Sequence, residues 1–273
     1  MKYVEKTFKF IGKFYLLVIP LYILAAIPAL INYIVVNGSL GGIFGSFSSM
    51  DNLFNQFDNP YEMFRSLSSL FFVASAASFI ALALRFLVMP VTYGLVNKAL
   101  QTGQGDLNDF SEAFSQNIGK YALYWLLNLA IWIVFMIAAF IIILILALLT
   151  AVIKWFGVFL LFIAIMAMIV AALVVITITS LWFASMVVDD FDVTKALKKS
   201  IELARKDFWM ILAVIVVVAI EGGIAGGILS FFGVIPVIGT LILSVIPATT
   251  EFFMVIFYLM FYRDKTEKSV SVV

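Results

Sequence analysis

Long apolar runs separated by short polar segments dominate the pattern of this chain. Each run reaches the ~20 residues that an α-helix needs to cross a lipid bilayer. The runs are continuous, whereas the strands of a transmembrane β-barrel alternate over ~10 residues. The pattern therefore predicts an all-α fold, a polytopic membrane bundle of six transmembrane helices in a single integral membrane domain over residues 1–273. The expected spans are Ile11–Val36, Leu70–Val96, Tyr121–Ala151, Trp155–Val188, Phe208–Phe232 and Val237–Tyr262.

The basic residues between the runs fall mostly on one side of the predicted membrane. An even number of spans places both termini on the same side, and that side carries 14 Lys and Arg residues against two on the other. Cytoplasmic connections carry such an excess, which predicts cytoplasmic N- and C-termini, including a tail at about 263–273. On the opposite side, Asn37–Arg65 is rich in Gly, Ser and Asn and predicts a surface loop.

A short basic amphipathic segment precedes each odd-numbered run, with apolar residues stepping by three or four. Two of these segments align at a constant offset, since Glu5 and Lys13 correspond to Glu112 and Lys120. We interpret the chain as three parallel copies of one unit, an interfacial helix followed by a transmembrane hairpin. The alternative is that any interfacial helix entering a membrane has this pattern.

The third amphipathic segment, Val193–Lys206, predicts an interfacial helix with Asp192 as its N-cap. Such a helix can lie along anionic lipid headgroups, where each basic residue contributes on the order of 1 kcal/mol. It can equally bind a protein partner at the cytoplasmic face. The lipid interpretation is favoured, because it requires no further component. The basic residues concerned are Lys195, Lys198, Lys199, Arg205 and Lys206.

Three charged residues, Arg85, Glu221 and Glu251, lie inside predicted spans. Counted from the nearest basic residue at the cytoplasmic edge, their depths are roughly 20, 22 and 18 Å at 1.5 Å per residue. A lone charge at this depth costs several kcal/mol, so we expect the three to form a buried cluster. The cluster is either a substrate or proton site of a transporter or a structural ion pair that fixes helix register, and the second interpretation is favoured.

Glycines follow Glu221 at the spacing of small-residue packing motifs. Small residues at this spacing allow a neighbouring helix to approach closely. The residues predicted to support close helix packing are Gly222, Gly223, Gly226 and Gly227.

The remaining chemistry is mostly excluded by composition. The chain has no cysteine and no histidine, which rules out disulfides, thiol chemistry and histidine acid–base catalysis. A formal net charge of +1 predicts no nucleic-acid partner. Asp189, Asp190 and Asp192 lack a second acidic motif, so we interpret them as a helix boundary with a cap. Nucleotide-binding and hydrolase motifs are absent as well, so we expect no catalytic, cofactor-binding or metal-binding residues and no enzyme.

From Val187 to Ser200 the sequence Val-Val-Asp-Asp-Phe-Asp-Val-Thr-Lys-Ala-Leu-Lys-Lys-Ser resembles a segment of uncharacterised prokaryotic membrane proteins. That group includes the membrane domain of some glycerophosphodiester phosphodiesterases, and the hydrolase domain of those enzymes is missing here. The resemblance implies a six-helix fold in a prokaryotic plasma membrane and implies no activity. We therefore expect a non-enzymatic accessory or scaffold protein that binds membrane lipid or a partner through its cytoplasmic helices. The alternative is a small-molecule or ion transporter that uses the charge cluster.

Overall fold

The computed structural model describes residues 2–47, 60–235, 237–268 and 270. Over these residues the protein is all-α, as predicted, and six helical stretches are long and apolar enough to cross a membrane. The main helices are α1 (Lys2–Lys13), α2 (Ile19–Phe47), α4 (Pro60–Thr102), α5 (Phe110–Ile153), α6 (Trp155–Thr179), α7 (Trp182–Asp189), α8 (Val193–Lys206), α9 (Phe208–Leu229) and α10 (Ile238–Lys265). Short 3-10 helices are η1 (Tyr15–Val18), η2 (Leu107–Asp109) and η3 (Ser230–Val234).

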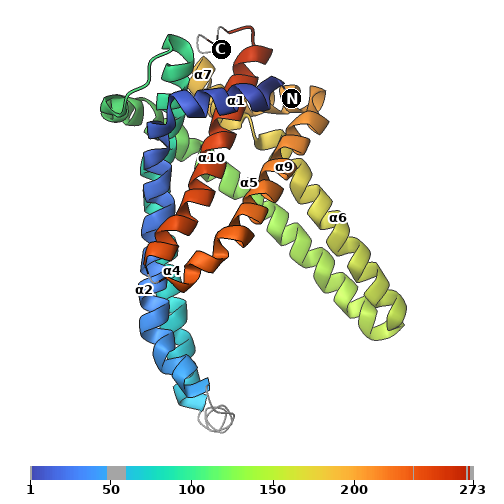
Figure 1. Ribbon diagram of the computed structural model, residues 1–273. Coiled ribbons are helices and arrows are strands. Elements are labelled where there is room, and N and C mark those ends of the chain that lie inside the picture. The colour runs from blue at the N-terminus through green and yellow to red at the C-terminus, as the bar shows by residue number, and fades with distance from the viewer. Residues whose placement is uncertain (1, 48–59, 236, 269, 271–273) are drawn as a thin grey trace.

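The bundle is closed at one end and splayed at the other (Figure 1). Helices α2 and α4 run side by side, α10 packs against both, and the α5–α6 hairpin diverges from them as a separate arm (Figure 1). Helix α1 lies across the closed end, next to the C-terminal end of α10, and the Tyr3 hydroxyl donates a 2.5 Å hydrogen bond to Asp264. We call this closed end the terminal end.

The packed core lies at the terminal end. Its largest fully buried side chains include Phe10 of α1, Leu95 of α4, Trp182 of α7, and Phe257 and Tyr262 of α10. The most apolar stretches of α5 and α6, by contrast, bury none of their residues inside the protein. Such outward-facing apolar surface is stable only in a nonpolar solvent, which identifies a multi-pass membrane protein.

The fourth predicted span, Trp155–Val188, is not one helix. Helix α6 ends at Thr179, and α7 begins again at Trp182. The hydroxyls of Thr179 and Ser180 donate to backbone carbonyls of Val175 and Thr177, at 2.8 Å each. Hydroxyl groups that bond back to the preceding turn bend helices. The break turns α7 into the core, where residues Trp182–Met186 are buried.

The amphipathic segments differ in structure. The first and third form separate helices, α1 and α8, whereas the second joins the following span within the continuous helix α5. The predicted loop Asn37–Arg65 is shorter than expected, because α2 continues to Phe47 and α4 begins at Pro60; its middle lies outside the described residues. The predicted tail at 263–273 starts inside α10, and the Lys268 ammonium contacts the Asp189 carboxylate.

The turn between α5 and α6 requires glycine at position 157. A Cβ added there would lie 2.4 Å from the Thr150 Cα, which is backbone and cannot rotate away. We expect Gly157→Ala to lower the free energy of unfolding by about 2 kcal/mol through overpacking. The loss of the helical circular dichroism signal on heating in detergent measures this change. The control is Gly119→Ala in α5, where no atom lies within 4 Å of the added Cβ and a gain of ~0.5 kcal/mol is expected. Equal effects of the two substitutions would contradict the steric explanation.

Candidate functional site

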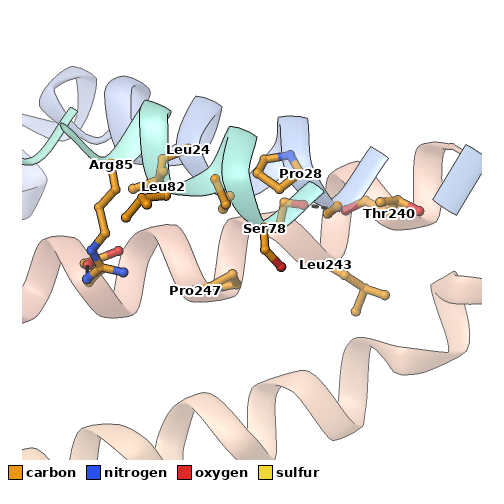
Figure 2. A pocket seen from close by; sticks show the side chains of 13 residues that line it. Leu24, Pro28, Ser78, Leu82, Arg85, Thr240, Leu243 and Pro247 are labelled. Atoms are coloured by element: carbon orange, nitrogen blue, oxygen red, sulfur yellow. Dashed lines mark hydrogen bonds and ion pairs between the residues drawn. The ribbon is translucent and has the colours of Figure 1, made fainter. Parts of the chain in front are cut away.

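An ion pair inside the predicted membrane region joins α4 to α10. The Arg85 Nη2 lies 2.5 Å from the Glu251 Oε1, so two of the three residues of the predicted cluster are in contact. Figure 2 shows Arg85 reaching from α4 toward α10. The Arg85 side chain is 48% exposed and the Glu251 side chain 28%, so the pair is not sealed within packed helices. Both residues line two cavities, one on each side of the pair.

The larger cavity, which we call the groove, has a volume of about 660 Å³ and lies between α2, α4 and α10. Apart from Arg85 and Glu251, its lining is mainly apolar, with Leu24, Leu82 and Leu243 among the lining residues (Figure 2). Two helix-interior prolines, Pro28 and Pro247, also line it. Proline has no N–H, so the carbonyls of Leu24 and Leu243, four residues earlier, lose their helical donor inside the groove.

The smaller cavity, which we call the chamber, has a volume of about 320 Å³ and lies between α4, α5, α6 and α10. Its lining is richer in polar groups and includes Tyr93, Tyr124, Asn128, Trp132 and Tyr258. In the described part of the chain, the three tyrosine hydroxyls make no hydrogen bond. A tyrosine hydroxyl can both donate and accept a hydrogen bond, so each of the three can bind a polar group that enters the chamber. The chamber is therefore suited to a polar occupant.

Glu221, the third member of the predicted cluster, lies elsewhere. Its side chain on α9 is exposed, and no ion pair involving it is present among the described residues. A Cβ added at Gly222 would lie 3.2 Å from the Thr250 Oγ1, so this glycine contacts α10 closely. At Gly223, Gly226 and Gly227 an added Cβ would meet no atom within 4 Å. The close packing predicted for the glycine segment is thus present at Gly222 and is not provided by the described chain at the other three.

Helix α8 turns its small and apolar face inward rather than toward lipid. Ala196, Leu203 and Ala204 are buried, and the Ser200 hydroxyl donates to the Ile178 carbonyl at 2.8 Å. Asp192 occupies the N-cap position, but its side chain makes no capping hydrogen bond. The basic residues face outward: Lys195, Lys198, Arg205 and Lys206 are exposed and Lys199 is half-buried.

Glu202 lies among these basic residues on α8. Lys206 donates to its carboxylate at 2.9 Å and Lys199 at 3.1 Å. These hydrogen bonds hold the pKa of the Glu202 carboxyl below its usual value. The carboxylate therefore stays ionised and reduces the repulsion between neighbouring ammonium groups on the outward face.

The aspartates at 189 and 190 connect helices, a role that the sequence pattern did not indicate. Asp189 accepts a 2.5 Å hydrogen bond from Tyr262 and also contacts Lys268. Asp190 has left-handed backbone geometry at the end of α7 and pairs with Lys120 at 2.5 Å. The hydrogen bond from Lys120 lowers the pKa of the Asp190 carboxyl. Both side chains are therefore used in joining α7 to α5 and α10.

Comparisons with known proteins identify the family of the chain but do not indicate an activity. No curated protein and no solved structure matches the chain. The resemblance to the membrane domain of glycerophosphodiester phosphodiesterases accordingly stays a prediction. One family model, described as a domain of unknown function (DUF7847), matches residues 15–264. Because this match spans most of the sequence, the chain belongs to the DUF7847 family.

Proposed function

We propose that the protein is a non-enzymatic accessory or scaffold protein that binds a lipid-like amphiphile at the Arg85–Glu251 pair. It acts in the plasma membrane of a prokaryote, with both termini in the cytoplasm. The observation that carries the proposal is an ion pair between an apolar groove and a polar chamber. Pockets that bind small ligands have volumes of ~300–1,000 Å³ and combine apolar walls with a few polar groups.

The outward basic face of α8 supports the proposal that the terminal end lies at the surface of the membrane. Its lysines and arginine point away from the protein core, and the neighbouring Trp209 is 78% exposed. Tryptophan and basic residues collect where membrane meets water, and basic residues there attract anionic headgroups. The helix thus anchors the terminal end at the membrane surface and leaves a face that a cytoplasmic partner can bind.

Blocking the groove tests the proposal. Ala81 of α4 lines it, and Ala81→Phe would fill part of its volume. We expect the amount of lipid that stays bound to the purified variant to be several-fold lower than for the wild type. Native mass spectrometry of the protein released from detergent measures this amount. The matched control is Ala138→Phe, at an exposed position on the α5 arm. Equal lipid retention by the wild type and both variants would refute binding in the groove.

A second candidate is a small-molecule or ion transporter. It is favoured by the two cavities that share the Arg85–Glu251 pair, because transporter sites lie near the membrane midplane between cavities. The exposed Glu221 offers a further ionisable group at predicted midplane depth. The experiment that separates this candidate from the first is solute or proton flux into liposomes that contain the protein. Flux abolished by Glu251→Gln or Glu221→Gln would support transport, and its absence in the wild type would exclude it.

A further inference from the structure

The charges of the site restrict which head group it can take. Among the residues that the structure describes, Arg85 and Glu251 are the charged ones that line the groove and the chamber, and their charges are opposite, so this lining has no net charge. A purely anionic head that bound Arg85 would separate the pair and leave the Glu251 carboxylate beside a second negative charge. In a low-dielectric environment, a charge without a partner costs several kcal/mol. A ligand that enters between the two residues must therefore satisfy both charges.

The chamber also presents groups that recognise a cation. The rings of Tyr93, Tyr124, Tyr258 and Trp132 line it together with the Glu251 carboxylate. Aromatic faces attract ammonium groups, and the attraction strengthens where water is excluded. The Arg85 guanidinium, in turn, matches the geometry of a phosphate or carboxylate. Recognition of an ammonium and an anion is thus available within one site.

We propose that the site binds a zwitterionic amphiphile, with its phosphate or carboxylate on Arg85 and its ammonium on Glu251 and the aromatic rings. The head occupies the chamber, and the hydrocarbon chain follows the groove between α2, α4 and α10. This inference rests on the proposed lipid binding and adds the class of head group. The chain gains by leaving water for the apolar groove, so the head alone binds more weakly than the whole amphiphile.

A competition experiment tests the head group. The full-length protein in detergent receives equal amounts of phosphatidylethanolamine, which is zwitterionic, and phosphatidylglycerol, which is anionic, and native mass spectrometry measures which is retained. We expect the wild type to prefer phosphatidylethanolamine. Glu251→Gln removes the partner of the ammonium, so its preference should shift toward phosphatidylglycerol by about tenfold. The control is Glu112→Gln, an exposed glutamate on α5 that lines neither cavity and lies outside the basic face of α8, and this variant should leave the preference unchanged.

The outcomes separate the two proposals. Suppose that Ala81→Phe reduces lipid retention, so that lipid binding in the groove stands. The zwitterion inference is then wrong if the wild type prefers phosphatidylglycerol, or if Glu251→Gln leaves the preference unchanged. If Ala81→Phe retains as much lipid as the wild type, the proposal of lipid binding in the groove is itself wrong. Soluble glycerophosphoethanolamine distinguishes a lipid from a free head. Displacement of the lipid by this compound at equal concentration would overturn the role of the groove in holding a chain.

Discussion

Arg85→Leu is expected to lower the free energy of unfolding by about 2–3 kcal/mol. The substitution removes the 2.5 Å partner of Glu251 and leaves a carboxylate without a counter-ion within the membrane region. The half-exposed guanidinium keeps this figure below the cost of breaking a fully buried pair. Unfolding of the purified protein in mixed micelles, titrated with sodium dodecyl sulfate, measures the effect.

The double variant Arg85→Leu/Glu251→Leu separates architecture from function. Apolar residues of similar volume often replace an ion pair at little cost, so stability should return to within about 1 kcal/mol of the wild type. Lipid retention should not return, because neither charge remains to hold the head group. If both stability and lipid retention recover in the double variant, the pair only fixes helix register. That result would favour the structural interpretation of these charges.

Trp182→Ala is expected to have the largest effect on folding, a loss of about 4 kcal/mol. The side chain is fully buried, and its ring meets that of Tyr124 edge to face at 5.3 Å. Its indole N–H donates a 2.8 Å hydrogen bond to the Val193 carbonyl in the first turn of α8. Removing the ring leaves a cavity at the terminal end and deletes this hydrogen bond between α7 and α8. The same detergent titration measures the loss.

Two further substitutions assign this effect to its causes. Trp182→Phe keeps most of the buried apolar surface but loses the hydrogen bond, so we expect a smaller loss of about 1–2 kcal/mol. Trp155 at the α5–α6 turn is 87% exposed, and Trp155→Ala should change stability by no more than about 0.5 kcal/mol. If Trp155→Ala lowered stability as much as Trp182→Ala does, burial of the Trp182 ring would not be the cause of its effect.

Position along a helix predicts the depth of a side chain in the membrane but not the direction in which it points. Counting at a fixed rise along each helix placed Arg85 and Glu251 at one level, and the two side chains do form an ion pair. The same count included Glu221 in the cluster, but depth says nothing about the direction in which a helix turns its side chains. Helix α9 exposes Glu221 instead of presenting it to Arg85. The chamber was missed, because its lining residues are spread over four helices with no shared sequence motif.

The sequence by itself determined the all-α class and the six apolar helices, because a bilayer requires ~20 apolar residues for each crossing. It also determined two of the three amphipathic helices, α1 and α8, through their helical period. Only the tertiary structure decided which faces pack. The apolar run from Trp155 to Val188 has one character throughout, yet α6 faces outward and α7 lies in the core. Lipid and protein interior are equally apolar, so hydrophobicity identifies residues that avoid water and cannot tell which of the two surrounds them.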